Sequence, residues 1–466
     1  MMPPHRTNAS AIARFFSVLA LVAGTYVAAT PETQAADHKV SPTAEKFNCS
    51  GVKPGDTVTL GSGTRGPLKI YDCNGSASNR IVIRNDPDGS GPLVIRRASG
   101  PERGFIFDCR NCIGVEIDGS YKWRGAPSGK TYGIKVTMTG GQGPSAFVRI
   151  GGVSRFFTIR NIEVDGAWPK LASDGSGIRV NDQEVNRSSN PGLWREGILI
   201  EDNYVHNIRN EGMYIGPNYS TGDIPLRNVE VRYNRVEDIG WEGINTKSMW
   251  DGDNSIHHNT VRRTGTNTSE GKSSQFSGIN NISGTVKIYN NWIETTGQHG
   301  ILVWTQGGPK ASEGRGPFLA HIWNNVIVGA GALWRSNMGA SHGINVGAES
   351  GTELPVPNVY SNTIVDARGG AINIGSVSAG LLRDNIAAGT RGNPVIRAPG
   401  GVKLINNWIG SVSAVEFMSA GSRNFRLSAS SPARNNGSNE FPPNDYGGVK
   451  RPQDGAPDQG AFEGGN

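Results

Sequence analysis

A repeat that runs through most of the chain restricts its fold more than any other feature. Each unit joins a short alternating apolar run, an asparagine, a second short run, and a glycine that apolar residues follow. Two such units are GILIEDNYVHNIRNEGMYIG from Gly197 to Gly216 and NVEVRYNRVEDIGWEGINTK from Asn228 to Lys247. The asparagine recurs, at intervals of 22 to 37 residues, at Asn203, Asn234, Asn259, Asn291, Asn325, Asn362, Asn385 and Asn407. Repeats of about 20–50 residues are typical of solenoids and propellers.

The short apolar runs favour a parallel β-helix among these architectures. They are rich in Val, Ile and aromatic residues and alternate with a period of two, and no segment keeps a period of 3.6. Propeller blades need about 40 residues or more, whereas the shortest unit has room for three short strands. We therefore predict an all-β solenoid whose coils stack about 4.8 Å apart around one core. The recurring asparagines are expected to have a structural role, because asparagine tolerates left-handed turns and can form an amide ladder.

The N-terminal residues 1–36 are typical of a secretory signal. His5, Arg6 and Arg14 precede an apolar run from Phe15 to Ala29, and small residues follow it. The run is shorter than the roughly 20 residues needed to span a bilayer, although an N-terminal membrane anchor remains the alternative. We expect an exported protein with a β-helix over residues 37–430 and a C-terminal capping segment over residues 431–466.

All four cysteines lie in the first quarter of the chain, at Cys49, Cys73, Cys109 and Cys112. In an exported protein an even number of cysteines predicts disulfides, here two bonds with three possible pairings. The motif from Cys109 to Cys112 is a CxxC without the βαβ context of redox proteins. Without a second CxxC it is also a weak zinc site.

The amino-acid composition restricts the classes of partner that this chain is expected to bind. The chain has 65 glycines, 18% charged residues and a formal net charge of +6, which is compatible with a polyanionic substrate. It has no basic run or aromatic platform for nucleic acid, and no later segment is apolar enough to span a membrane. We expect a monomer that binds an anionic polysaccharide.

The glycines of the repeat bring ionisable residues into register. When the units are aligned on that glycine, the residue before it is Ser176, Glu211, Glu242, Ser277, His299, His342, and finally Gly369 or Gly370. In a stacked solenoid these residues form one column, in which Glu211 and Glu242 are neighbours about 5 Å apart. Like charges at this distance repel unless a cation or a shared proton intervenes.

Two further columns follow the glycine and add groups suited to sugars. Two residues after it come Tyr214, Asn245, Asn280, Leu302 and Asn345, and four residues after it come Gly216, Lys247, Ile282, Trp304 and Gly347. A single polar residue at a coil corner is usually only solvated, but no other part of the sequence concentrates ionisable residues in this way. Insertions at 181–196, 217–227, 265–277, 305–318 and 331–342 are expected to form the walls of a groove beside these columns.

Two stretches resemble known proteins. The segment from Ser431 to Glu463, with SPARNNG and DQGAFE, resembles the terminal motif of secreted bacterial right-handed parallel β-helix proteins. Val52–Leu60 and 79–85 resemble their opening coils, and 42–48 is expected to cap the core. These resemblances imply a right-handed, single-stranded solenoid.

The segment Glu242-Gly-Ile-Asn-Thr-Lys247-Ser248, with Asn254 and Asn259 after it, resembles the Glu-Ile-Ile-Ser-x-Lys-Ser stretch of chondroitinase-B/alginate-lyase-type polysaccharide lyases. The resemblance implies that Lys247 is the Brønsted base and that Glu242 binds calcium, with Glu211 in the place of a further family glutamate. The spacing from Lys247 to Asn254 is longer by three residues, and the family's Arg-His-Gly is absent.

Together these features predict an exported lyase acting on a uronate-containing polysaccharide. The expected catalytic residues are Lys247, His299 and His342; the substrate-binding residues are Trp304, Tyr214, Asn245, Asn280 and Asn345; and Glu211 and Glu242 are the expected Ca²⁺ ligands. A hydrolase using Glu211 and Glu242, a C5-epimerase and a non-catalytic carbohydrate-binding protein remain alternatives.

Overall fold

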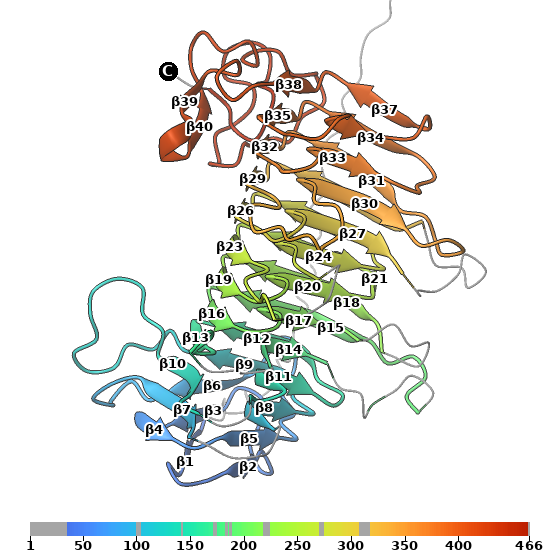
Figure 1. Ribbon diagram of the computed structural model, residues 1–466. Helices are drawn as coiled ribbons and strands as arrows, with labels where there is room; N and C mark the ends of the chain where they lie inside the picture. The colour runs from blue at the N-terminus through green and yellow to red at the C-terminus, as the bar shows by residue number, and fades with distance from the viewer. Residues whose placement is uncertain are drawn as a thin grey trace, which may run out of the picture. The chain divides into compact units, whose positions relative to one another are not determined.

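The computed structural model describes residues 35–98, 104–140, 143–170, 175–181, 185, 189–217, 224–269, 275–306 and 317–464. The described residues from Ala36 onward belong to one compact unit. The predicted signal, residues 1–36, lies almost wholly outside them. This unit is the expected parallel β-helix, in which three parallel sheets run along the stack of coils (Figure 1).

The three sheets, here called A, B and C, have 14, 12 and 12 strands, and each coil normally gives one strand to each sheet. Sheet A contains β1 (Asp37–Val40), β3 (Thr57–Leu60), β6 (Ile81–Asn85), β9 (Ile113–Asp118), β12 (Arg155–Arg160), β15 (Arg195–Glu201), β18 (Leu226–Arg232), β21 (Met249–Asp251), β22 (Ser255–His257), β25 (Val286–Tyr289), β28 (Leu319–Trp323), β31 (Val356–Tyr360), β34 (Gly380–Arg383) and β37 (Val402–Ile405).

Sheet B contains β2 (Lys46–Asn48), β5 (Leu68–Tyr71), β8 (Phe105–Arg110), β11 (Ala146–Gly151), β14 (Ser176–Val180), β17 (Met213–Ile215), β20 (Ile244–Lys247), β24 (Ile279–Ile282), β27 (Ile301–Thr305), β30 (Ile344–Ala348), β33 (Ile372–Ile374) and β36 (Ile396–Arg397). Sheet C contains β4 (Gly63–Arg65), β7 (Leu93–Arg97), β10 (Ile134–Met138), β13 (Ile162–Asp165), β16 (Tyr204–Ile208), β19 (Arg235–Ile239), β23 (Thr260–Thr264), β26 (Trp292–Glu294), β29 (Val326–Val328), β32 (Thr363–Val365), β35 (Ile386–Ala388) and β38 (Trp408–Gly410).

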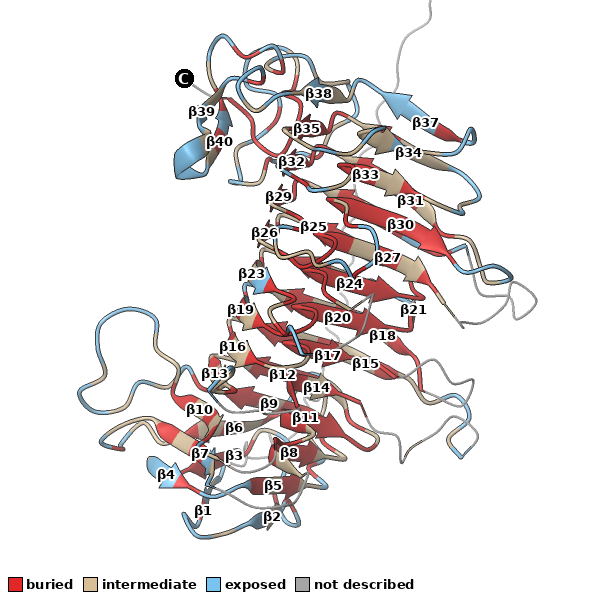
Figure 2. Ribbon diagram, viewed as in Figure 1, coloured by how far each residue is buried: buried red, intermediate tan, exposed pale blue. Residues whose placement is uncertain are grey.

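The alternating pattern of the strands creates one axial core, visible as buried strands along the stack in Figure 2. In sheet A, for example, a continuous row of apolar side chains lies in register from coil to coil. The row runs through Ile159, Ile200, Val231, Ile256, Ile288, Ile322, Val359 and Leu382. Burying such a row of aliphatic side chains contributes about 1.5–3 kcal/mol per residue before chain entropy is counted.

The asparagine ladder is present at the corner between sheets A and C. The Nδ2 of each asparagine donates to the Oδ1 of the next, at 2.8 to 3.0 Å, from Asn203 through Asn407. The left-handed backbone, however, belongs to the residue before each asparagine, such as Tyr233 (φ 54°) or Asn290 (φ 52°). The expectation that the asparagine itself adopts this conformation is therefore wrong. The preceding residue makes the turn, and the asparagine side chain points into the corner.

At the N-terminal end of the solenoid, the structure shows how the first strands pair and how the cysteines are joined. β1 and β2 already pair with the next coil, so residues 42–48 belong to the first coil's turn and second strand. The two disulfides join Cys49 to Cys73 and Cys109 to Cys112.

The parallel coils end at β38. An antiparallel pair follows, made of β39 (Phe417–Ser419) and β40 (Asn424–Leu427) with the 3₁₀ turn η2 (Ala420–Ser422) between them. The remaining residues pack along the flank of the last coils, where Ala461 and Phe462 join a cluster with outward residues of sheet C such as Val326 and Ile386. Among the described residues, no helix has the length and apolar character to cross a membrane.

Candidate active site

The column ahead of the shared glycine exists as predicted, and backbone hydrogen bonds fix its register. The N–H of Gly212 donates to the carbonyl of Glu242 at 2.9 Å, and that of Gly278 to the carbonyl of His299 at 2.9 Å. The series continues with Gly300 to His342 and Gly343 to Gly370, so Gly370 is the last member of the column. Glu242 and His299 are therefore two coils apart, with Ser277 between them.

The shared glycine is required because it fits a close approach between coils. A Cβ atom on Gly278 would lie 2.5 Å from Cγ2 of Ile293 and 2.7 Å from the carbonyl oxygen of Gly300. Contacts this short do not occur for a real Cβ, so any side chain here would push the coils apart. The glycine thus lets sheet B begin directly after a tight corner, with the residue before it at the edge of the outer face.

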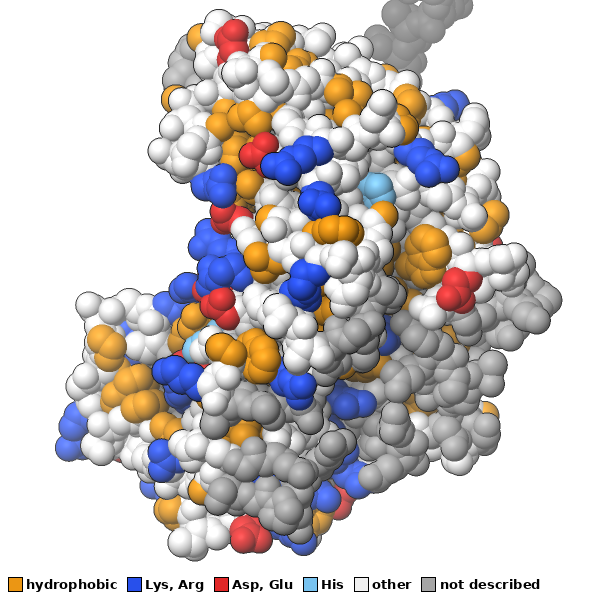
Figure 3. Space-filling view, viewed as in Figure 1, with side chains coloured by type: hydrophobic (Ala, Val, Ile, Leu, Met, Phe, Trp, Pro, Cys, Tyr) orange, Lys and Arg blue, Asp and Glu red, His pale blue; other side chains and the backbone are white. Residues whose placement is uncertain are grey.

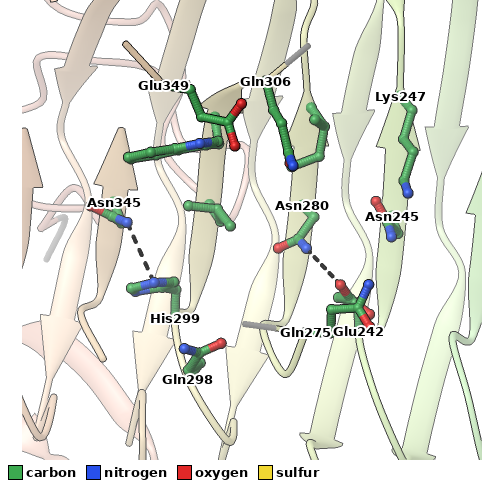
Figure 4. Close-up of a pocket in the computed structure, with 13 residues that line it drawn as sticks. Glu242, Asn245, Lys247, Gln275, Asn280, Gln298, His299, Gln306, Asn345 and Glu349 are labelled. Atoms are coloured by element: carbon green, nitrogen blue, oxygen red, sulfur yellow. Dashed lines mark hydrogen bonds between the residues drawn. The ribbon is translucent and has the colours of Figure 1, made fainter. Parts of the chain in front are cut away.

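A cavity of about 410 Å³ lies on the outer face of sheet B, over β20, β24, β27 and β30 (Figure 4). Its lining combines one buried carboxylate, one ammonium group, one imidazole, several amides and an indole. The lining residues are Glu242, Asn245, Lys247, Gln275, Asn280, Ile282, Gln298, His299, Leu302, Trp304, Gln306, Asn345 and Glu349. Seven of the ten residues predicted from the sequence line this one cavity: Glu242, Asn245, Lys247, Asn280, His299, Trp304 and Asn345.

The other three predicted residues lie beside the cavity. Tyr214 is 6% exposed and forms a platform below the lysine, with Lys247 Nζ 4.5 Å from its ring centroid. His342 stacks on His299 with ring centroids 5.6 Å apart. Glu211 is buried and accepts a hydrogen bond from Ser176 Oγ at 2.9 Å. These three residues contact or neighbour lining residues without facing the hollow.

Glu211 and Glu242 form hydrogen bonds in opposite directions along the helix axis. Glu211 bonds to Ser176 on the coil before it, whereas Glu242 Oε1 accepts from Asn280 Nδ2 at 3.0 Å on the coil after it. Only Glu242, which is 1% exposed, lines the cavity. The register therefore makes the two carboxylates neighbours in the column, while their hydrogen bonds direct them to different surroundings.

The two histidines are held as neutral hydrogen-bond donors. His299 Nδ1 accepts the backbone N–H of His342 at 3.0 Å, and His342 Nδ1 accepts the backbone N–H of Gly370 at 3.1 Å. Burial, with a smaller contribution from the charge of His342, lowers the pKa of His299 to about 3. Burial also lowers the pKa of His342, and the charge of Arg397 adds to that effect. A neutral imidazole whose Nδ1 accepts a hydrogen bond carries its proton on Nε2.

Two buried amides offer oxygen acceptors at the cavity. Within the described part of the chain, Oδ1 of Asn245 and Oδ1 of Asn280 have no hydrogen-bond partner. Both side chains are nearly inaccessible, at 1% and 2% exposure. Because an unsatisfied buried acceptor costs about 1–3 kcal/mol, these oxygens are suited to a ligand hydroxyl, a water molecule or a cation.

Trp304 provides an apolar wall, and the glycine of the next coil allows it to do so. A Cβ atom on Gly347 would lie 2.6 Å from Cζ3 of Trp304, so the indole lies over the bare backbone of that glycine. Lys247 and Trp304 belong to the same outward column, two coils apart. The cavity thus has a polar floor of amides and an aromatic wall, an arrangement typical of ligand-binding pockets.

Sequence analysis missed several lining residues. Gln306 and Glu349 follow β27 and β30 in register, six residues after the shared glycine, so the same alignment contains the signal for both. Gln275 and Gln298 precede that glycine by three and two residues, inside loops of irregular length. Parts of the predicted wall-forming insertions, namely 182–184, 186–188, 218–223, 270–274 and 307–316, lie outside the described residues.

A second ionisable cluster lies on sheet C. Ligand atoms of Glu163, Asp165 and His206 lie within 4.8 Å of one another. Lys135 Nζ is 2.8 Å from Glu163 and 3.6 Å from Asp165, and Asn207 Nδ2 donates to Asp165 at 3.1 Å. Because a lysine and an amide already use these oxygens, the cluster is a closed ion-pair network.

Comparison with solved structures supports the fold. No family model matches the chain, and no curated protein matches its sequence. The structure of pectate lyase Pel9A has a TM-score of 0.52 at 14% identity, over 92% of this chain and 96% of that chain. An alginate lyase from Paenibacillus sp. str. FPU-7 covers 80% of this chain and 99% of its own at 12% identity, with a TM-score of 0.38. A GH136 lacto-N-biosidase from Eubacterium ramulus has a TM-score of 0.44 at 12% identity, over 81% of this chain and 68% of its own.

Proposed function

We propose that this protein is an exported enzyme that cleaves a uronate-containing polysaccharide by β-elimination, with Lys247 as the base. The observation that carries the proposal is the shared cavity, which places Lys247 beside a buried carboxylate, two acceptor amides, a neutral histidine and Trp304. Pel9A, a pectate lyase, has the same fold, and this likeness is compatible with the proposed chemistry.

The reaction requires two proton movements around one sugar. Lys247 in its neutral form takes the C5 proton of a uronate, and the electron pair left on C5 forms the C4–C5 double bond. The C4–O4 bond breaks, and O4 leaves with a proton from water or from a side chain. Atoms and charge balance without a redox partner, because one C–H and one C–O bond are exchanged for a C=C and an O–H bond.

The hydrogen bonds of the two histidines indicate which cavity residue acts as the base and which acts as a hydrogen-bond donor. Because Nδ1 of His299 accepts the backbone N–H of His342, its proton lies on Nε2, which is 3.4 Å from Asn345 Nδ2 at the cavity (Figure 4). His299 is then a donor to a substrate oxygen and is not available as the base, which leaves that role to Lys247. His342 supports this orientation through its own backbone and stacking contacts.

The oxygen donors at one edge of the cavity are of the chemical type that a calcium ion prefers. Glu242, with the buried Oδ1 atoms of Asn245 and Asn280, offers hard oxygen ligands of the kind that Ca²⁺ prefers. Such an ion, when bound, neutralises the substrate carboxylate and so makes the C5 proton more acidic. Glu211 bonds to Ser176, outside the cavity lining, and enters this set only if its side chain turns.

A glycoside hydrolase is the second candidate, because two carboxylates do line the cavity. They are Glu242, which is buried, and Glu349, which is exposed, and Figure 4 shows them on opposite sides of the hollow. Such a pair of unlike carboxylates could act as acid and base around a glycosidic bond. A C5-epimerase shares the first proton transfer with the lyase and differs in returning a proton to C5.

The test is to incubate the purified protein with pectin-type, alginate-type and glucuronate polymers and to follow ultraviolet absorbance and reducing ends together. A lyase raises both, a hydrolase raises reducing ends alone, and an epimerase raises neither but exchanges the C5 hydrogen with solvent. Lys247→Ala is expected to lower the rate about 10²–10⁴-fold, the range typical for loss of a general base. The matched control is Lys287→Ala on sheet A, which removes a surface lysine paired with Asp253. Equal rates for the two variants would refute the proposed role of Lys247.

A further inference from the structure

The column of residues two places after the shared glycine continues well beyond the cavity in both directions. Strand pairing in sheet B places one outward residue of every coil in this column. From β14 to β36 it reads Arg179, Tyr214, Asn245, Asn280, Leu302, Asn345, Asn373 and Arg397. Seven steps of about 4.8 Å separate the first member from the last, a distance of roughly 34 Å.

The stretch of this column from Arg179 to Arg397 has a cation at each end and uncharged residues between them. On the N-terminal side of Arg179 the column continues with Arg149, which is paired with Asp108 at 2.8 Å. Arg179 and Arg397 form no ion pair with any carboxylate of the described residues. Several outward arginines of the solenoid are paired with carboxylates, for example Arg232 with Glu201 at 2.7 Å and Arg263 with Asp238 at 2.6 Å. On the face shown in Figure 3, basic side chains also outnumber acidic ones. The sheet B face thus carries two guanidinium groups in one register, neither of them neutralised by a carboxylate of the described residues.

A second hollow lies at the C-terminal end of the column. It has a volume of about 660 Å³, and its lining includes Asn373, Ser376 and Arg397. Asn373 Nδ2 donates to Asn345 Oδ1 at 2.7 Å, and Asn345 lines the first cavity. The two hollows therefore meet at one pair of amides. Arg397 is exposed and stands three coils beyond Leu302 in the same column.

The N-terminal end of the column is built differently. The guanidinium carbon of Arg179 lies 5.2 Å from the ring centroid of Tyr214, and the Lys247 ammonium group lies 4.5 Å from the same centroid. The tyrosine ring thus links the two cations, and Arg179 is the next basic group of the face beyond the lysine. A planar guanidinium group is well suited to binding a carboxylate through two hydrogen bonds.

We infer that the sheet B face binds a linear polyanion along the helix axis, with Arg397 and Arg179 holding carboxylates at subsites on either side of the cavity. This inference rests on the proposed function and specifies its substrate: a polyuronate that extends past the cavity at both ends and is cut within the chain. Recognition beyond the cavity depends on charge, since these two arginines are the ionic groups of the column between β14 and β36.

Binding of oligouronates of increasing length, measured by calorimetry on the full chain, tests the inference. The variants are Arg397→Gln and Arg179→Gln, each checked by circular dichroism, and the control is Lys403→Gln. Lys403 is an exposed residue of the last coil on sheet A, so its replacement removes the same charge from the same end on another face. Neutral gluco-oligosaccharides of matched length serve as the uncharged probe.

We expect affinity to rise with length and then level off once the oligomer reaches both arginines. Arg397→Gln lowers the affinity for the long oligomers about tenfold, and added salt reduces this difference. It leaves the shortest binding oligomers unchanged, and Lys403→Gln has less than a twofold effect. The inference is overturned if Arg397→Gln matches Lys403→Gln at every length, if the neutral probe binds equally well, or if no oligouronate binds.

The same titrations in Lys247→Ala separate this inference from the proposed function. If length-dependent binding persists while the unaltered protein releases no unsaturated product, the elimination chemistry is wrong and the polyanion groove stands. If the protein is active but releases only terminal units, the groove is wrong and the chemistry stands. Cleavage within the chain is recognised because the viscosity of the polymer falls rapidly while few reducing ends have been released.

Discussion

Glu211 and Glu242 are adjacent in one column of the solenoid, yet Glu211 bonds backward to Ser176 and Glu242 bonds forward to Asn280. Adjacency in register therefore does not make them a catalytic pair. Because their surroundings differ, substituting each glutamate separately should have different effects on activity.

Glu242→Gln is expected to abolish activity, because it removes the carboxylate that lines the cavity, whereas Glu211→Gln should reduce the rate less than tenfold. Initial rates on the preferred polymer, with calcium and with a chelator, provide the measurement. If Glu242 acts by holding calcium, raising the calcium concentration should partly restore the activity of Glu242→Gln, because mass action offsets a weakened site. An equally large loss in Glu211→Gln would instead show that both carboxylates act together.

Glu349→Gln distinguishes the two reaction classes. A lyase based on Lys247 should keep its rate within about threefold, because the exposed Glu349 carboxylate transfers no proton in that reaction. A hydrolase that uses Glu242 and Glu349 should lose at least a hundredfold. Reducing ends and ultraviolet absorbance are measured on the same samples. The neighbouring Glu353→Gln, outside the cavity lining, serves as the control.

Gly347→Ala should raise KM several-fold with a smaller effect on kcat, because its methyl group would displace the Trp304 ring from the position over the backbone. The effect should vanish in a Trp304→Ala background, where no ring remains to be moved. A double-mutant cycle on KM supplies the coupling between the two residues. Additive effects of the two substitutions would mean that Gly347 acts through another contact.

The buried histidines predict loss of stability in acid. The folded protein keeps His299 unprotonated down to a pKa of about 3, whereas the unfolded chain protonates it near 6.5. Between these values the unfolded state binds more protons, so the free energy of unfolding is highest above pH 6.5 and falls as the pH decreases. His258, whose pKa burial lowers to about 4, acts in the same direction.

His299→Asn is therefore expected to narrow the difference in unfolding free energy between pH 7 and pH 5 by about 2 kcal/mol. Urea unfolding at the two pH values, followed by circular dichroism, gives that difference. The control variant Lys287→Ala should leave it unchanged. If the unfolding free energies of His299→Asn at pH 7 and pH 5 differ as much as those of the original protein, His299 titrates normally.

Asn291→Ala should destabilise the solenoid by about 3 kcal/mol. The Asn291 Nδ2 donates to Asn325 and to the carbonyls of Ile256 and Tyr289, and its Oδ1 accepts from the backbone N–H and the Nδ2 of Asn259. Removing the amide therefore loses several hydrogen bonds in a buried corner. The matched control is Asn358→Ala, an outward asparagine of β31 that is not part of the ladder. Urea midpoints of the two variants should differ clearly, and equal midpoints would contradict a structural role of the ladder.

The sequence by itself determined the architecture, because a solenoid is built from local repeats. The spacing of asparagine and glycine fixed the coil, the alternation fixed which side chains face the core, and the shared glycine fixed which residues share a column. Seven predicted residues therefore line one cavity, since register in a stacked fold follows directly from alignment. The same alignment could also have predicted Gln306 and Glu349, which lie six residues after the shared glycine.

Only the tertiary structure decided the directions of the side chains and the contents of the loops. The opposite hydrogen bonds of Glu211 and Glu242, the Nδ1 contacts that make His299 a donor, and the position of Tyr214 below Lys247 depend on neighbours from other coils. Alignment places a Cα atom in a column but leaves the side-chain rotamer open. That rotamer is selected by contacts between coils 20 to 50 residues apart in sequence, a choice that a one-dimensional repeat does not encode.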